Sequence, residues 1–162
     1  MLEIYSDRVS QYNLAVCLRD GNGIQQNYVE AFKWFCLAAD QGLALAQYNV
    51  ASFYENGLGV SRNINKAFKW YKLSAKQGLD ISQYSLGMLY LLDSNTQRDY
   101  LKANKWLELA AKQGLEQAKY SLGMLYKLGL GVSQSNTEAI KWFNQASNLE
   151  SAKKELKKLL PC

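Results

Sequence analysis

Four tryptophans, Trp34, Trp70, Trp106 and Trp142, follow one another at intervals of 36 residues. A tyrosine row, an alanine row and a glycine row keep the same interval: Tyr12, Tyr48, Tyr84 and Tyr120; Ala31, Ala67, Ala103 and Ala139; Gly42, Gly78 and Gly114. A fixed period of roughly 20–50 residues is typical of a solenoid, in which one small unit stacks on copies of itself. This period constrains the fold more strongly than the composition does.

Each repeat has the pattern of a helix, a glycine loop and a second helix. In the clearest repeat, residues 43–56 and 64–77 carry helix formers with apolar residues at helical spacing. Gly57 is placed to end the first helix in the left-handed conformation. The residue before each second helix can accept a hydrogen bond from its first turn, and these residues are Asn27, Asn63, Asp99 and Ser135. The glycine row is predicted to end the second helices.

The sequence therefore predicts an all-α fold, a right-handed α-solenoid of stacked antiparallel helix pairs. We expect a single domain over residues 1–162 with about four 36-residue repeats and a C-terminal capping helix. The repeats are placed at about 7–42, 43–78, 79–114 and 115–148, and the capping helix at 149–160. This last segment resembles another first helix in which lysines replace Tyr and Met, as a water-exposed solenoid end requires.

Residue sizes predict how the two helices of a repeat pack. One position of the first helix holds only small residues, which let the second helix approach closely: Ala15, Ala51, Gly87 and Gly123. Large residues of the second helices fill the volume between layers, and the tryptophans are expected to be buried core. The three cysteines, Cys17, Cys36 and Cys162, do not form a disulfide framework. Cys17 and Cys36 are expected to be small buried hydrophobic residues, with a disulfide between them as the alternative.

The repeats resemble the Sel-one-like repeat family, a branch of the α-solenoids related to tetratricopeptide repeats. The resemblance covers about residues 7–148 and is carried in the second repeat by Ala46, Val50, Ala51, Tyr54, Gly57, Gly59, Val60, Asn63, Lys66, Ala67, Trp70, Tyr71, Ala75 and Gly78. In the fourth repeat it is carried by Ala118, Leu122, Gly123, Tyr126, Gly129, Gly131, Val132, Ala139, Trp142 and Phe143. The third repeat departs from the pattern, because Asp93-Ser-Asn-Thr replaces the glycine loop.

Several function classes lack their usual residues. The chain has no histidine, no Walker loop, no dinucleotide fingerprint and no zinc-spaced cysteine cluster. We therefore predict no enzyme activity, no cofactor and no metal site. No signal peptide or membrane span is recognised, so we expect a cytoplasmic protein, with a secreted effector or a fragment of an exported protein as alternatives.

The resemblance implies that the first helices line a concave groove that grips a partner. On the tetratricopeptide template, the tyrosine row points into this groove with a set of neighbouring residues: Arg19, Ser52, Glu55, Ile81, Met88, Leu91, Met124 and Lys127. An exposed strip of Tyr and Met is typical of a protein or peptide site. The alternative is that the tyrosines only bridge adjacent repeats.

Two functions follow from this surface. The favoured hypothesis is a scaffold or adaptor that binds a peptide or partner protein along the groove, acting as a monomer or as part of a longer chain or complex. The alternative is RNA binding by helical repeats, which requires a basic stripe. The first helices instead end with Arg19, Glu55, Leu91 and Lys127, which form no such stripe. Nucleic acid is therefore disfavoured as a partner. Membrane insertion is not expected, because no apolar stretch is long enough for a membrane span.

Overall fold

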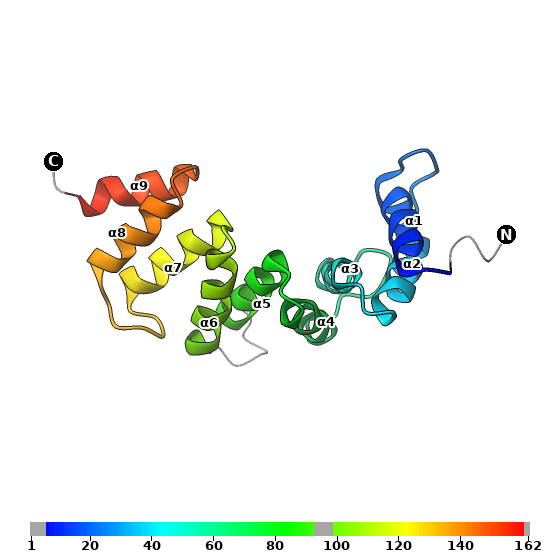
Figure 1. The fold of residues 1–162 in the computed structure, drawn as a ribbon, viewed down its shortest axis with the longest axis horizontal. Coiled ribbons are helices and arrows are strands. Elements are labelled where there is room, and N and C mark those ends of the chain that lie inside the picture. The colour runs from blue at the N-terminus through cyan, green and yellow to red at the C-terminus, as the bar shows by residue number, and fades with distance from the viewer. Residues whose placement is uncertain (1–5, 93–98, 161–162) are drawn as a thin grey trace. The chain divides into compact units, whose positions relative to one another are not determined.

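The structure, a computed structural model, describes residues 6–92 and 99–160. Within these ranges it contains nine helices and no strand, which confirms the all-α prediction (Figure 1). The helices are α1 (Arg8–Asp20), α2 (Tyr28–Asp40), α3 (Ala44–Asn56), α4 (Ile64–Lys76), α5 (Asp80–Leu92), α6 (Tyr100–Lys112), α7 (Glu116–Leu128), α8 (Asn136–Gln145) and α9 (Glu150–Leu159). The loop predicted at 93–96 and Cys162 lie outside the described residues.

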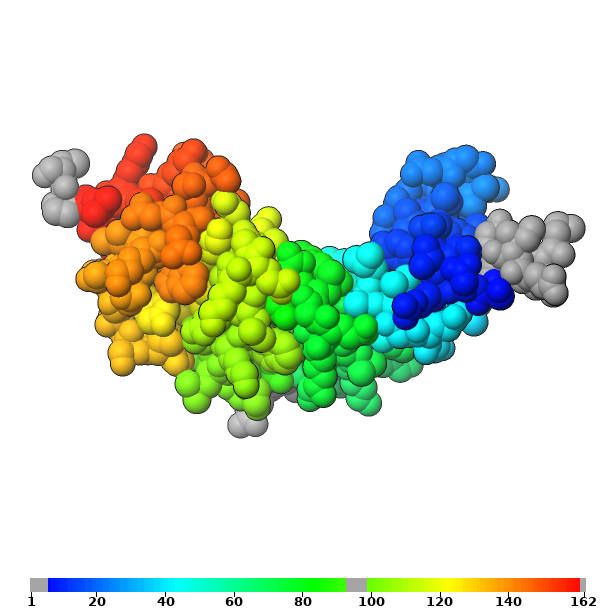
Figure 2. Space-filling model, in the orientation of Figure 1, coloured from blue at the N-terminus to red at the C-terminus, as the bar shows by residue number. Residues whose placement is uncertain are grey.

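Residue contacts divide the chain into two compact units, Met1–Leu79 and Asp80–Cys162. In unit 1, α1 pairs with α2 and α3 with α4, and α2 also packs on α3. In unit 2, α5 pairs with α6 and α7 with α8, α6 packs on α7, and α9 packs on α8 (Figure 1). Figure 2 shows the red atoms of the C-terminal helix beside the orange atoms of α8. The treatment of residues 1–162 as one domain stays a prediction. No helix among the described residues is long and apolar enough to span a membrane.

Local sequence signals start and stop the helices as predicted. Asn27, Asn63, Asp99 and Ser135 cap the second helices, each side chain accepting a hydrogen bond from the backbone N–H three residues later. The same four residues donate backbone N–H bonds of 2.8–3.1 Å to carbonyls nine residues earlier. Gly57 ends α3 with a φ of 73°, as expected for a left-handed cap. Every repeat therefore closes its loop with the same bonds.

The small position of the first helix permits close contact within each repeat. Ala15 and Ala51 are fully buried. A methyl group at Gly87 would lie 2.8 Å from Leu107 Cγ, and one at Gly123 would clash with the Phe143 ring. The absence of a side chain at these two positions therefore sets how closely α5 meets α6 and α7 meets α8.

The tryptophans are only partly buried, so the expectation that they form the buried core is wrong. The fully buried position is the next one, which faces the first helix of the same repeat and holds Phe35, Tyr71, Leu107 and Phe143. Because successive residues of a helix are about 100° apart, the tryptophan turns to the edge of this core. Trp34, Trp70 and Trp142 pack there as partly buried residues.

A pair of glutamines ties the two helices of three repeats together, and the sequence analysis did not identify it. The side-chain amide at the end of the second helix donates to a buried glutamine of the first helix: Gln41 to Gln11 at 2.9 Å, Gln77 to Gln47 at 2.7 Å, and Gln113 to Gln83 at 2.9 Å. These bonds satisfy polar groups that would otherwise be costly to bury.

Cys17 and Cys36 are free thiols, so the alternative of a bridge between them is wrong. Both side chains are partly buried, which agrees in part with the expected role as small hydrophobic residues. Burial raises the pKa of the Cys36 thiol to about 11. The reactive thiolate of Cys36 is therefore scarce at neutral pH.

In the second and fourth repeats, the second glycine of the glycine loop allows the loop to lie directly on the preceding repeat. A methyl group at Gly59 would lie 2.5 Å from the Tyr28 carbonyl carbon, and one at Gly131 would lie 2.6 Å from the Tyr100 carbonyl carbon. Both glycines also have a left-handed φ, +62° and +71°. In each unit this contact fixes the loop against the start of an earlier second helix.

We expect Gly59→Ala to lower the free energy of unfolding by about 2–4 kcal/mol, because it combines a left-handed φ with a clash against backbone. Gly23→Ala is the matched control, since Gly23 holds the same repeat position with a φ of +75° and nothing within 4 Å of the added carbon. It should cost only about 1 kcal/mol. Urea unfolding followed by circular dichroism measures both, and equal losses would contradict the role of the contact.

Candidate functional site

The predicted groove residues are partly exposed, but most of them also contact their own repeat. Three rings of the tyrosine row pack on the buried aromatic residue of the second helix, each at 5.7 Å between ring centroids: Tyr12 on Phe35, Tyr48 on Tyr71, and Tyr120 on Phe143. Tyr84 packs in the same way against the core that contains Leu107. The contact of each tyrosine within its own repeat gives the row a structural role beside any role in binding.

The polar residues of the predicted groove in unit 1 already have partners. Arg19 donates to Asn49 Oδ1 at 2.8 Å and pairs with Asp20 at 2.7 Å, which lowers the pKa of the Asp20 carboxyl. Glu55 accepts a 2.6 Å bond from the Tyr71 hydroxyl. Burial, and then the charge of Glu55, raise the pKa of Tyr48. Ser52 accepts a bond from the Asn56 amide.

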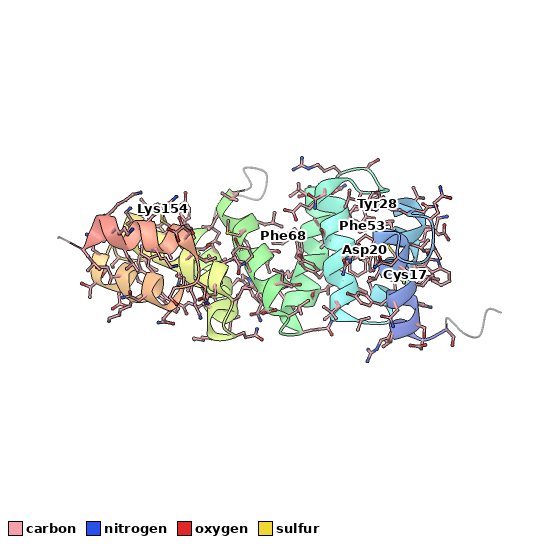
Figure 3. The ribbon with its side chains drawn as sticks, turned by 90° about the horizontal axis from the view of Figure 1, so that it is seen from above. Cys17, Asp20, Tyr28, Phe53, Phe68 and Lys154 are labelled. Atoms are coloured by element: carbon pink, nitrogen blue, oxygen red, sulfur yellow. The ribbon has the colours of Figure 1, made fainter. Side chains whose placement is uncertain are left out.

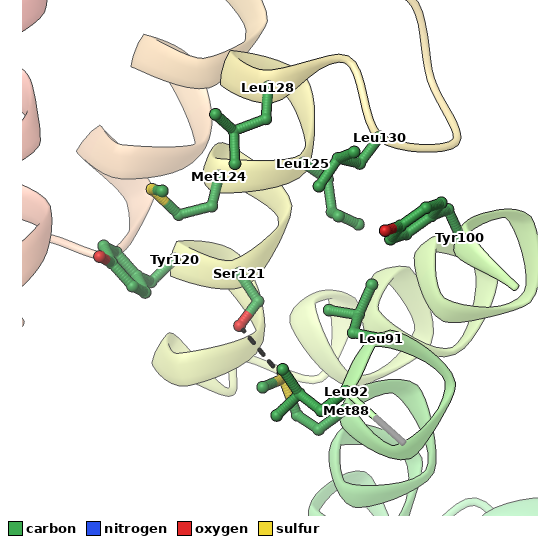
Figure 4. Close-up of a pocket in the computed structure, with 10 residues that line it drawn as sticks. All are labelled: Met88, Leu91, Leu92, Tyr100, Tyr120, Ser121, Met124, Leu125, Leu128 and Leu130. Carbon is green, nitrogen blue, oxygen red and sulfur yellow. Dashed lines mark hydrogen bonds between the residues drawn. The ribbon is translucent and has the colours of Figure 1, made fainter. Parts of the chain in front are cut away.

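Unit 2 contains an open apolar pocket of about 430 Å³ between α5 and α7 (Figure 4). Nine of its ten lining residues are apolar or aromatic, and the set is Met88, Leu91, Leu92, Tyr100, Tyr120, Ser121, Met124, Leu125, Leu128 and Leu130. The Ser121 hydroxyl donates to the Gln117 carbonyl at 2.9 Å and lies 3.8 Å from Met88 Sδ. The pocket therefore offers almost purely hydrophobic walls.

Four local structures bring these side chains together (Figure 4). The α5 wall carries one methionine and two leucines, the α7 wall carries most of the remaining residues, and Tyr100 is the first residue of α6. Leu130 comes from the loop after α7. The close approach of Gly131 to the Tyr100 backbone holds this loop, and with it Leu130, beside the start of α6.

Four lining residues were among the predicted groove residues, namely Met88, Leu91, Tyr120 and Met124. The sequence analysis missed the other six. A signal for the pocket is nevertheless present in the repeats. Leu91 and Leu92 stand where the first two repeats carry Arg19-Asp20 and Glu55-Asn56, and Leu128 stands 36 residues after Leu92. Apolar residues at repeat positions that are polar in the first two repeats indicate that the surface becomes apolar here.

The same junction between neighbouring first helices is closed by polar bonds elsewhere in the chain. In unit 1, Arg19 of α1 bonds Asn49 of α3. The equivalent positions between α5 and α7 are Leu91 and Ser121, 72 residues later, and both line the pocket. Leu125 likewise occupies the position of the larger Phe53, whose ring packs against Tyr28 at 6.1 Å (Figure 3). Smaller and apolar residues therefore leave the hollow open in unit 2.

A carboxylate closes the next junction, between α7 and α9. Glu155 is buried and bonds two ammonium groups, Lys127 of α7 and Lys158 of α9, the latter at 2.7 Å. Hydrogen bonds from Lys127 and then Lys158 lower the pKa of Glu155 below its ordinary value of about 4.5. Lys127, a predicted groove residue, is therefore engaged in holding the C-terminal helix.

The pocket offers mainly apolar contact. Among the described residues, no group of three or more His, Cys, Asp or Glu side chains is arranged to hold a metal ion. Leu92 and Leu128 remain 68% and 54% exposed at the pocket. What these walls can do is accept apolar groups from another molecule.

The family model for the Sel1 repeat matches four consecutive segments, residues 8–43, 44–79, 80–115 and 116–151. The chain therefore belongs to the Sel1 repeat family, which confirms the resemblance seen in the sequence. Proteins of this family are generally non-enzymatic repeat scaffolds that bind other proteins.

Solved structures share the fold. The chain is 29% identical to a Sel1 repeat protein from Oxalobacter formigenes, with a TM-score of 0.88 and coverage of 94% of this chain and 63% of that one. It is 31% identical to c5321, a protective antigen present in uropathogenic Escherichia coli strains that displays an SLR fold, with a TM-score of 0.91 and coverage of 96% and 34%. The chain thus spans less than two thirds of either protein.

Helicobacter pylori cysteine rich protein B has the same fold at 19% identity, with a TM-score of 0.62 and coverage of 84% of this chain and 99% of that one. No curated protein matches the chain.

We expect Glu155→Gln to weaken the attachment of α9 at neutral pH by on the order of 1 kcal/mol, because it removes the charge that Lys127 and Lys158 share. The folded pKa of Glu155 is lowered, so its contribution is complete above about pH 4.5 and is lost as the pH falls through the folded value. The difference between wild type and variant should therefore shrink when the pH is lowered from neutral to well below 4.5.

Hydrogen exchange of the α9 amides at both pH values measures this effect. Glu150→Gln is the matched control, because Glu150 is exposed on the same helix and its Lys153 contact is long, 3.7 Å. Glu150→Gln should change the protection of the α9 amides from hydrogen exchange only slightly. A difference for Glu155→Gln that stays constant across the pH range would contradict the charge-based explanation.

Proposed function

We propose that the chain is an interaction scaffold that binds a partner protein or peptide through the pocket between α5 and α7. Apolar side chains of the partner enter this pocket and contact Met88 and Met124. The observation that carries the proposal is an open hollow of about 430 Å³ with leucines at its exposed positions. Contiguous apolar surface of this kind is rare on soluble proteins outside binding sites.

The chemistry of the lining supports a protein ligand. Methionine is flexible and polarisable, and it therefore adapts to anchors of different shape. Tyr100 and Tyr120 supply rigid contact area with a polar tip, a property that enriches tyrosine at interfaces. Leucine, methionine or phenylalanine side chains of a partner match such walls, whereas phosphate groups would find no cation among the lining residues.

The comparison between the two units also supports the proposal. In unit 1 the equivalent positions hold polar residues that bond to each other, as Arg19 does to Asn49. The repeat fold forms there with polar side chains, so it does not need leucines at the equivalent positions in unit 2. The apolar residues at Leu91, Leu92 and Leu128 are better explained by contact with a partner.

The other predicted groove residues remain proposed partner contacts, each within its own unit. Ile81, Tyr84 and Lys127 belong to unit 2, and Tyr84 packs beside Met88 and Leu91 against the same core. Tyr12, Arg19, Tyr48, Ser52 and Glu55 belong to unit 1 and would contribute a more polar surface. RNA binding, the alternative, gains no support from a pocket whose lining carries no cation.

The proposal predicts that the Leu91→Arg/Ser121→Asn variant loses partner binding, because it copies the Arg19–Asn49 pair of unit 1 into the open junction. Random peptides displayed on phage are selected on the wild-type protein. We expect enrichment of peptides with Leu, Met or Phe anchors whose affinity falls about tenfold or more on the variant. Fluorescence anisotropy of the synthetic peptides measures the affinity.

Leu109→Arg is the matched control, because Leu109 is exposed on α6 outside the pocket and receives the same charge. It should leave the affinity within about twofold. Circular dichroism verifies that both variants keep their helices. Peptides that bind the double variant as tightly as wild type would place the binding site elsewhere and refute the proposal.

A further inference from the structure

The surface beside the pocket changes from apolar to basic at α9. Tyr120 and Met124 line the pocket and also pack against the small core of Ala139, Phe143, Ala146 and Ala152. Leu149, Leu156 and Leu159 pack against the same core, so one wall of the pocket is continuous with the C-terminal helix. Glu155 accepts hydrogen bonds both from Lys158 and from Lys127 of α7, the helix that forms one wall of the pocket. Lys158 therefore lies close to the pocket wall.

Two lysines of α9 occupy the positions that face the groove in the earlier first helices. Lys154 and Lys158 stand 34 residues after Tyr120 and Met124, in line with the two-residue shortening of the turn before α9. They are one helical turn apart and thus share a face. Lys154 is exposed on the surface of α9 (Figure 3). Among residues 6–92 and 99–160, no carboxylate pairs with Lys154, whereas Lys158 pairs with Glu155.

The local charge is therefore positive next to an apolar hollow. Lys127, Lys154 and Lys158 bring three ammonium groups to this end of unit 2, and Glu155 supplies one carboxylate, which leaves a net charge of +2. A partner that covers both regions needs apolar side chains for the pocket and acidic side chains for α9. Such complementarity steers encounter and fixes the orientation of the bound segment.

The walls also select the backbone conformation of the partner. The pocket presents three hydroxyls, and that of Ser121 is already used in a bond to the Gln117 carbonyl. An extended peptide would bury backbone N–H and C=O groups with too few partners, which is costly. A helix satisfies these groups internally and presents side chains of one face to the groove.

We infer that the partner segment is an amphipathic helix that buries apolar side chains in the α5–α7 pocket and places Asp or Glu side chains over Lys154 and Lys158. This inference rests on the proposed function. It adds the conformation of the partner, the sign of its charge and the direction in which it lies, from the pocket toward α9.

The test uses two displayed libraries on the wild-type protein: unconstrained random peptides, and helical peptides in which one face and its flanks are randomised. We expect the helical library to give the tighter binders, with Leu, Met or Phe on one face and Asp or Glu on one flank. Lys154→Glu should weaken these binders roughly three- to tenfold, and the loss should diminish at high salt. Fluorescence anisotropy of the synthetic peptides measures the affinity for wild type and variant at low and at high salt.

Lys157→Glu is the matched control on the same helix. Lys157 stands 34 residues after Gly123, a position that faces the second helix in the fourth repeat. It lies about 60° around the helix from Lys154 and about 100° from Lys158, on the side away from Lys158. Both substitutions change the net charge equally, and Lys157→Glu should change the affinity by less than about twofold.

The outcomes separate this inference from the proposed function. Binders that lose affinity on the Leu91→Arg/Ser121→Asn variant depend on the pocket. If such binders keep their affinity on Lys154→Glu, or lack an acidic flank, the inference is overturned and the proposed function stays intact. Tighter pocket-dependent binders from the unconstrained library that stay extended when bound would overturn the helical conformation. A selection without pocket-dependent binders would overturn both.

Discussion

The architecture depends on the contact between a small residue of each first helix and a large residue of the second helix. Phe35, Tyr71, Leu107 and Phe143 are fully or almost fully buried, and Leu107 and Phe143 lie against Gly87 and Gly123. The buried Ala15 and Ala51 hold the same repeat position as these glycines. Because this contact recurs every 36 residues, each repeat forms the same helix pair. The capped second helices and glutamine pairs add directional bonds to a unit that hydrophobic packing already defines.

The repeats differ from one another mainly at the junctions between neighbouring first helices. An arginine–asparagine bond closes the junction of α1 and α3, and a buried glutamate with two lysines closes that of α7 and α9. Leucine, serine and methionine leave the junction of α5 and α7 open. The same backbone thus supports a sealed polar contact or an apolar pocket, depending on a few side chains that the repeat pattern does not fix.

This division explains what could be predicted from the sequence. Caps such as Asn63 and terminating glycines such as Gly57 act within a few residues, and the period carries each assignment to the other repeats. The extent to which Trp70 is buried could not be predicted in the same way, because a shift of one position along a helix turns a side chain by about 100°. The pocket was only partly predicted, since its walls come from four segments and its volume depends on how far each side chain reaches.

The exposed leucines of the pocket favour binding more directly than its shape does, because covering them lowers the free energy. Burying a leucine completely stabilises a protein by about 1.5–3 kcal/mol, yet Leu92 and Leu128 are 68% and 54% exposed. Most of that free energy is therefore not realised in the free chain, and polar residues at these positions, such as Asp20 and Asn56, serve the fold as well. A partner that covered both leucines would gain about 2–4 kcal/mol in total. This gain corresponds to roughly twenty- to several-hundred-fold in affinity, before any contribution from the methionines or from the lysines of α9.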